Sequence, residues 1–243
     1  HTGPKRGNRG PGARLAIGAG LDGIEHALGI LEDAMDQAVP VPADYDPFDS
    51  SHIFRYWYGR MHTVVNSTTV GELVQLMVEE DVYFAPTLNN FMRNFVQRNT
   101  PEVESDPNLK YIPEDEPDRF GRFTEEDRQE WRKTMELMKE ATYKFHEAGR
   151  LLINGTDSPG AALPGWSLHQ EMELFVEAGL TPMEALLATT LNNAKVLGKE
   201  DELGTIEAGK YADLIILDAD PLLDISNTQE IHLVIKGGLV LYP

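Results

Sequence analysis

Cysteine is absent from this chain of 243 residues. The absence excludes disulfide bonds and metal sites built from thiolates, but it does not fix the compartment in which the protein works. Long apolar runs are also missing, because no stretch approaches the roughly 20 residues that a membrane-spanning helix needs. The sequence therefore predicts a globular chain without a membrane span, and both a cytoplasmic and an exported location stay open.

Basic residues are few, with 21 Lys and Arg against 40 Asp and Glu, for a net charge of −19. Binding a phosphate backbone needs clustered Lys and Arg, so we expect no nucleic-acid partner. An anionic membrane surface is disfavoured for the same reason. We interpret the excess of acids as a solvated surface that keeps the protein in solution.

An initiator methionine and a signal-peptide pattern are also lacking, since the chain begins at His1. We expect either a cleaved precursor or a part of a larger protein.

Strands and helices alternate along the pattern of apolar residues, which favours a parallel α/β sheet. Strands are expected over 21–26, 82–88 and 151–153, and helices over 13–20, 68–80, 124–148, 168–178 and 182–197. After residue 203 the pattern changes to a strand over 212–218 and a hairpin over 231–242. Residues 28–58 and 94–123 show no regular pattern, and we expect them to cover a pocket.

Asp157 follows the strand over 151–153, and His26 follows the strand over 21–26. Parallel α/β barrels place their chemistry just past the carboxyl ends of their strands. The residues alone favour a plainer interpretation, in which Asp157 is a turn residue and His26 is structural. Strand alternation predicts that Glu25 points away from any site that His26 faces.

Specific motifs fill the second half of the chain. They are INGTD at 153–157, LHQE at 168–171, EAGLTP at 177–182, ALLATT at 185–190 and LGTIEAGKYADL at 203–214. From Gly149 onwards the sequence resembles the metal-dependent amidohydrolase superfamily, in its imidazolonepropionase-like and Xaa-Pro-dipeptidase-like branch. The motifs GIEH at 23–26 and APTL at 85–88 are similar to the ends of its sixth and seventh barrel strands.

The resemblance implies an α/β fold in two parts. Residues 1–202 would be the C-terminal part of a TIM-like (β/α)8 barrel, and residues 203–243 would be strands of a small β-sandwich domain. It also implies a centre of one or two divalent metal ions, with zinc as the expected metal. The implied ligands are His1, His26 and Asp157. Asp157 would be the catalytic proton shuttle. For His169, contact with substrate or with a metal ligand and a plain capping or core role are equally open.

The superfamily's His-x-His pair and its carboxylated Lys or Glu have no counterpart here, and no His-x-His occurs in the chain. The chain alone therefore carries at most half of a metal centre. We expect an N-terminal half of the barrel in the same precursor or in another chain. The remaining expected partner is a small-molecule amide or peptide substrate, and assembly into a homo-oligomer stays open.

Three functions are compared on this basis. The resemblance favours a hydrolase of amide or cyclic-amide C–N bonds that uses a metal-activated water. The alternative is a non-catalytic half-barrel or pseudoenzyme subunit that needs a separate N-terminal half. A copper site at the amine and imidazole of His1 is disfavoured by the helical middle of the chain and its C-terminal motifs.

Overall fold

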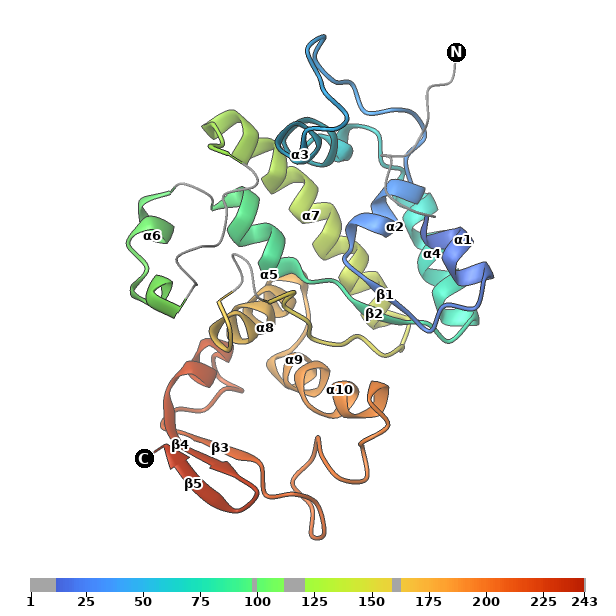
Figure 1. The fold of residues 1–243 in the computed structure, drawn as a ribbon. Coiled ribbons are helices and arrows are strands. Elements are labelled where there is room, and N and C mark those ends of the chain that lie inside the picture. The colour runs from blue at the N-terminus through green and yellow to red at the C-terminus, as the bar shows by residue number, and fades with distance from the viewer. Residues whose placement is uncertain (1–11, 98–99, 112–120, 159–162, 243) are drawn as a thin grey trace.

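A short parallel sheet lies near the centre of the protein. The computed structural model describes residues 12–97, 100–111, 121–158 and 163–242. Strand β1 (Gly23–Glu25) pairs in parallel with β2 (Tyr83–Ala85), and Phe84 also forms a parallel bridge with Leu152. All three segments run in the same direction, so their carboxyl ends meet at one edge (Figure 1). The sequence predicted all three, although the third is a single bridge and not a full strand.

Helices surround this sheet (Figure 1). The α-helices of six or more residues are α1 (Ala13–Gly18), α2 (Leu28–Asp33), α4 (Ser67–Glu79), α7 (Glu125–Glu147), α8 (Trp166–Ala178), α9 (Pro182–Thr189) and α10 (Leu191–Val196). The remaining described helices are the α-helices α3 (Ser50–His52), α5 (Leu88–Phe91) and α6 (Pro101–Glu104), the π-helices η1 (Ile53–Tyr58) and η3 (Met92–Val96), and the 3-10 helices η2 (Met61–Thr63), η4 (Pro107–Tyr111) and η5 (Ile225–Gln229).

Helix α7 is the central support of the core. It begins with a capping box, in which the Thr124 hydroxyl accepts from the backbone N–H of Asp127 and the Asp127 carboxylate accepts from the backbone N–H of Thr124. It ends before Gly149, which adopts φ +76°. Its buried face carries the residues that the helical pattern predicts, Trp131, Met135, Met138, Thr142 and Phe145. The predicted helix over 124–148 is confirmed.

The predicted helix over 182–197 is divided, and this corrects the sequence analysis. Thr190 leaves the helical conformation at ψ −83° and separates α9 from α10. The side-chain amides of Asn192 and Asn193 then donate to the carbonyl oxygens of Leu152 and Asn154. These bonds satisfy backbone carbonyl groups at the third parallel segment, and they accompany the break between α9 and α10.

The two stretches expected to be irregular contain short helices. Helices α2, α3 and η1 occupy part of 28–58, while η3, α6 and η4 occupy part of 94–123. The helices of these stretches are six residues or fewer. Such short pieces lack the two full turns over which an apolar periodicity can be recognised.

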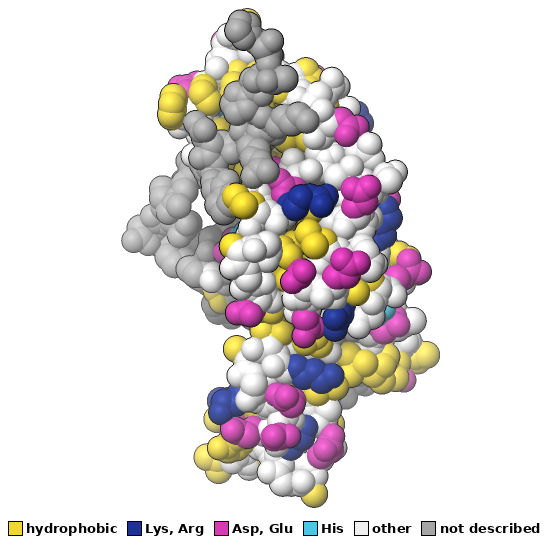
Figure 2. Space-filling model, turned by 90° about the vertical axis from the view of Figure 1, so that its right-hand side faces the viewer, with side chains coloured by type: hydrophobic (Ala, Val, Ile, Leu, Met, Phe, Trp, Pro, Cys, Tyr) yellow, Lys and Arg dark blue, Asp and Glu magenta, His cyan; other side chains and the backbone are white. Residues whose placement is uncertain are grey.

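The C-terminal segment forms an antiparallel sheet in the order β3 (Leu214–Leu217), β4 (Ile231–Lys236), β5 (Leu239–Tyr242). The hairpin turns at Gly237 and Gly238, as predicted, with both residues at positive φ. Apolar side chains are exposed on this sheet, including Ile215, Ile216, Leu239, Val240 and Leu241. The face of the molecule drawn in Figure 2 carries acidic side chains scattered among basic and hydrophobic ones. The division at residue 203 and the sandwich architecture stay predictions.

Across the described residues, none of the helices is both long and apolar enough to span a membrane.

Replacing Thr124 by Ala should lower the free energy of unfolding by about 1 kcal/mol, because the backbone N–H of Asp127 loses its acceptor. Urea denaturation measures the change. Thr68→Ala is the matched control, since Thr68 is exposed within α4 and Ala has the higher helix propensity. An equal loss in both variants would contradict the capping role.

Candidate functional site

Left-handed backbone conformations mark the edge where the three parallel segments end. His26 follows β1 at φ +68°, Thr87 follows β2 at φ +53°, and Asp157 follows the Leu152 bridge at φ +54°. Side-chain-bearing residues rarely adopt this conformation, and a β-branched residue such as Thr does so least. Strained residues of this kind cluster at functional sites. The edge is therefore the first candidate for a site.

The imidazole of His26 is held in one orientation. Its Nδ1 lies 2.7 Å from the hydroxyl of Thr87, and that hydroxyl donates to the carbonyl oxygen of Pro86 at 2.8 Å. Since the hydroxyl has only one proton, it accepts from His26, and we assign the ring proton to Nδ1. The ring edge also meets Phe91 at 6.0 Å between centroids. This arrangement leaves the lone pair of Nε2 available to a ligand.

The carboxylate of Asp157 is exposed and is oriented by one amide. Asn90 Nδ2, from α5, donates to Asp157 Oδ2 at 2.6 Å. The same asparagine accepts from Asn94 through Oδ1. One helical segment thus carries the group that orients Asp157.

His26 and Asp157 line one cavity of about 360 Å³. Its wall includes the aromatic side chains Phe54, Tyr58, Phe91 and Phe95, so the stretch over 28–58 does contribute to a pocket. Glu25 and Glu32 line it as well. The Glu25 carboxylate accepts from the hydroxyl of Tyr83 at 3.5 Å, and the direction of Glu25 relative to His26 stays a prediction.

These residues match the chemistry of a divalent metal, for which imidazole nitrogen and carboxylate oxygen are suitable donors. Within the described residues, however, no group of three or more His, Cys, Asp and Glu side chains could hold an ion. The third predicted ligand, His1, lies outside the described residues. The described part of the chain therefore offers two candidate ligands and does not complete a centre.

His169 lies away from this cavity. Its Nδ1 is 2.9 Å from the hydroxyl of Thr228 in η5, and that hydroxyl donates to the carbonyl oxygen of Ile225. Burial lowers the pKa of His169, because the charged imidazolium is desolvated. The contact ties α8 to the C-terminal segment, and a role for His169 with substrate stays a prediction.

Glu171 is the residue of this region that the sequence analysis did not single out. Its side chain is fully buried, and its carboxylate accepts from the backbone N–H groups of Leu88, at 2.8 Å, and Asn89. Burial raises the pKa of Glu171 to about 8, against the opposing effect of these two donors. The helical period gave a signal, since Ser167, Glu171 and Phe175 share the buried face of α8.

A family model matches the second half of the chain. Residues 135–241 match the model of the amidohydrolase family. The imidazolonepropionase of Streptococcus gordonii is 37% identical over 113 residues, which cover 43% of this chain and 36% of that protein.

The C-terminal part of this chain belongs to the amidohydrolase superfamily.

Solved structures extend the likeness in fold to nearly the whole chain. A Xaa-Pro dipeptidase with bound methionine in its active site superposes with a TM-score of 0.57 at 24% identity, over 95% of this chain and 42% of that one. Ochratoxinase of A. niger gives a TM-score of 0.54 at 20% identity, over 94% and 38%. The chain thus spans less than half the length of each of these relatives.

Replacing Glu171 by Gln should lower stability by about 1–3 kcal/mol at pH 5, because one backbone N–H of the pair Leu88 and Asn89 then loses its acceptor. With a pKa of about 8 in the folded protein and 4.5 as its ordinary value, Glu171 contributes stability that is lost as the pH rises between them. The advantage of Glu171 over Gln should therefore shrink from pH 5 to pH 8 in thermal unfolding.

Glu125→Gln is the matched control. The pKa of Glu125 is lowered by hydrogen bonds from Arg132 and Arg128, so its stabilisation is lost only as the pH falls below the ordinary range of a carboxyl. Its effect should be constant from pH 5 to pH 8. A constant effect of Glu171→Gln over the same range would contradict the raised pKa.

Proposed function

We propose that this chain supplies the C-terminal half of a metal-dependent hydrolase of amide or cyclic-amide C–N bonds. The observation that carries the proposal is that His26 and Asp157, each in a strained backbone conformation, line the same cavity. Membership of the amidohydrolase superfamily supports hydrolysis as the reaction class. Relatives named imidazolonepropionase and Xaa-Pro dipeptidase support a cyclic-amide or dipeptide substrate.

His26 Nε2 and the Asp157 carboxylate would hold a divalent ion, zinc in our proposal. When bound, such an ion lowers the pKa of water and polarises a carbonyl group. Asp157 would accept the proton of the attacking water and deliver it to the leaving nitrogen. Asn90 holds one carboxylate oxygen of Asp157, which restricts its rotation. Thr87 keeps the proton of His26 on Nδ1, away from the metal side of the ring.

An N-terminal half, in the same precursor or in another chain, would complete the site. Two observations support this part of the proposal: the described residues contain no group of three metal ligands, and the chain covers only 42% of the Xaa-Pro dipeptidase. The apolar side chains exposed on β3 and β5 would then pack against further strands of a β-sandwich. His1 would be a third ligand.

The same absence of a third ligand among the described residues favours a second candidate function, a non-catalytic subunit. The mass and metal content of the native protein distinguish the two. A complex with an N-terminal half and a stoichiometric metal supports the hydrolase, whereas this chain alone without metal supports the second candidate.

Asp157→Asn in the complete protein should reduce hydrolysis of N-acyl amino acids, dipeptides or imidazolones by about 100-fold or more, because the proton acceptor is lost. The zinc content, measured by mass spectrometry, should fall with it. A variant with His1, His26 and Asp157 all replaced by Ala is the stronger test. Full metal occupancy in that variant would rule out the proposed ligands.

Thr87→Val should weaken zinc binding about 10- to 100-fold, because the hydroxyl that orients a ligating imidazole is removed. Thr87→Ser, which keeps the hydroxyl, is the matched control and should bind zinc as the parent does. Titration calorimetry of the complete protein measures both affinities. Equal affinities for Val and Ser would show that Thr87 does not orient His26.

A further inference from the structure

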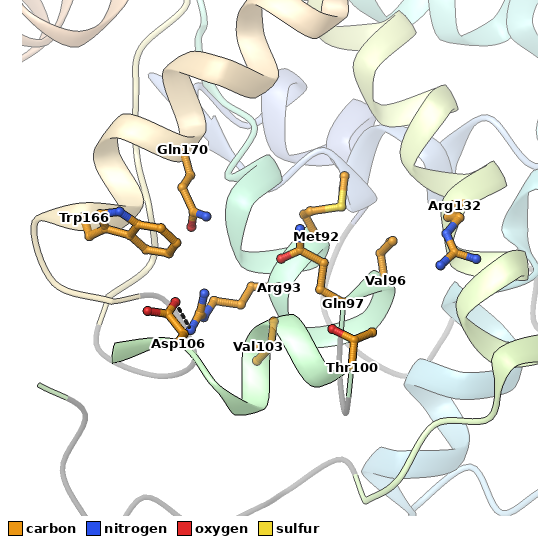
Figure 3. Close-up of a pocket in the computed structure, with 10 residues that line it drawn as sticks. All are labelled: Met92, Arg93, Val96, Gln97, Thr100, Val103, Asp106, Arg132, Trp166 and Gln170. Atoms are coloured by element: carbon orange, nitrogen blue, oxygen red, sulfur yellow. Dashed lines mark hydrogen bonds and ion pairs between the residues drawn. The ribbon is translucent and has the colours of Figure 1, made fainter. Parts of the chain in front are cut away.

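A second cavity, of about 430 Å³, lies between the start of α8, the π-helix η3 and α6 (Figure 3). Its volume is within the range of small-molecule sites. None of its lining residues lines the cavity of His26 and Asp157. The two cavities adjoin opposite sides of the segment 88–97, so the second one needs its own explanation.

Arg93 provides a buried charge on the wall of this cavity. Its residue is 3% exposed, Nη2 lies 3.0 Å from Asp106 Oδ2, and the guanidinium lies 5.3 Å from the centroid of the Trp166 ring. Within the described part of the chain, Asp106 is its one hydrogen-bond acceptor. Since a guanidinium has five N–H groups, Arg93 keeps donors for a ligand.

Gln170 and Trp166 are fixed in place beside Arg93. The Oε1 atom of Gln170 accepts from Asn89 Nδ2 at 2.7 Å, which leaves the amide NH2 group to donate. The indole Nε1–H of Trp166 donates to Gln229 at 3.0 Å. Both side chains come from α8 and are held before any ligand arrives, which lowers the ordering cost of binding.

The described residues that line the second cavity carry a net positive charge, although the whole chain has a net charge of −19. Its charged residues are Arg93, Arg132 and Asp106. Arg132 pairs with Glu125 at 2.7 Å, and Arg128 pairs with the same carboxylate at 2.8 Å. The wall also includes the apolar side chains Met92, Val96 and Val103 and the polar side chains Gln97 and Thr100.

From this arrangement we propose that the second cavity binds a small organic carboxylate with an apolar body. The carboxylate accepts from the free N–H groups of Arg93, a geometry suited to a planar fork, and from the NH2 group of Gln170. The apolar body packs against Met92, Val96 and Val103. This inference is independent of the proposed hydrolase function, because it involves neither His26 nor Asp157.

Phenylacetate and its neutral analogue phenylacetamide are the probes that test the charge requirement. Calorimetric titration of the 243-residue chain should give binding of phenylacetate at least about tenfold tighter than binding of phenylacetamide. Val103→Trp, which fills the cavity, should abolish binding of phenylacetate. Arg93→Lys should weaken it at least about fivefold, because the ammonium keeps the charge but loses the fork.

Arg60→Lys, at a guanidinium that lines neither cavity, is the matched control for Arg93→Lys and should bind phenylacetate as the parent does. If Arg93→Lys fails to fold, as judged by circular dichroism, Val103→Trp decides the location of the site, because Val103 is only partly buried. Absence of phenylacetate binding, equal binding of the two probes, binding that persists in Val103→Trp, or an equal loss of binding in Arg60→Lys and Arg93→Lys would overturn the proposal.

Discussion

The buried carboxyl of Glu171 accepts hydrogen bonds from the first backbone N–H groups of helix α5, in the place of an N-cap side chain. The geometry of the candidate site depends on these bonds. Helix α5 has only four residues and receives no capping bond from the side chain of its N-cap residue, Thr87. The N–H groups at a helix start need acceptors, and α8 provides them through Glu171. The hydroxyl of Thr87 is therefore released from capping and orients His26 instead. A helix this short would not be stable without such tertiary contacts.

Helix α5 and the residue before it therefore orient both candidate metal ligands, His26 and Asp157. Thr87, just before α5, contacts His26, and Asn90, within α5, contacts Asp157. The strain of the left-handed residues at the three strand ends is tolerated because these contacts and the parallel pairing determine their positions together. A shift of α5 by a fraction of an ångström would change both contacts at once. The site is thus a property of the α5–α8 contact as much as of the strands.

The sequence pattern predicted those parts of the fold that depend on residues close together in the chain. The capping box of α7, its apolar face and the hairpin at Gly237 follow from neighbouring residues, and the placement of His26 and Asp157 after strands was correct. The partnership of Glu171 with Leu88 joins residues 83 positions apart, and no local pattern contains that information. The same holds for Asn192, whose bond to the Leu152 carbonyl accompanies the break before α10. The sequence predicted most helices and strands, but it did not predict the polar contacts between residues far apart in the chain.

The segment 88–97 borders both cavities because of its helical period. Asn90, Phe91 and Phe95 face the cavity of the candidate ligands, whereas Met92, Arg93 and Val96 face the second cavity. The π-helix η3 lies within this segment, and such turns are frequent at functional sites. Both faces are anchored to α8 by adjacent residues, since Gln170 binds the side chain of Asn89 and Glu171 binds its backbone. The two cavities therefore share the segment 88–97 as a common wall. The position of this segment depends on the carboxyl group of Glu171, which lines neither cavity.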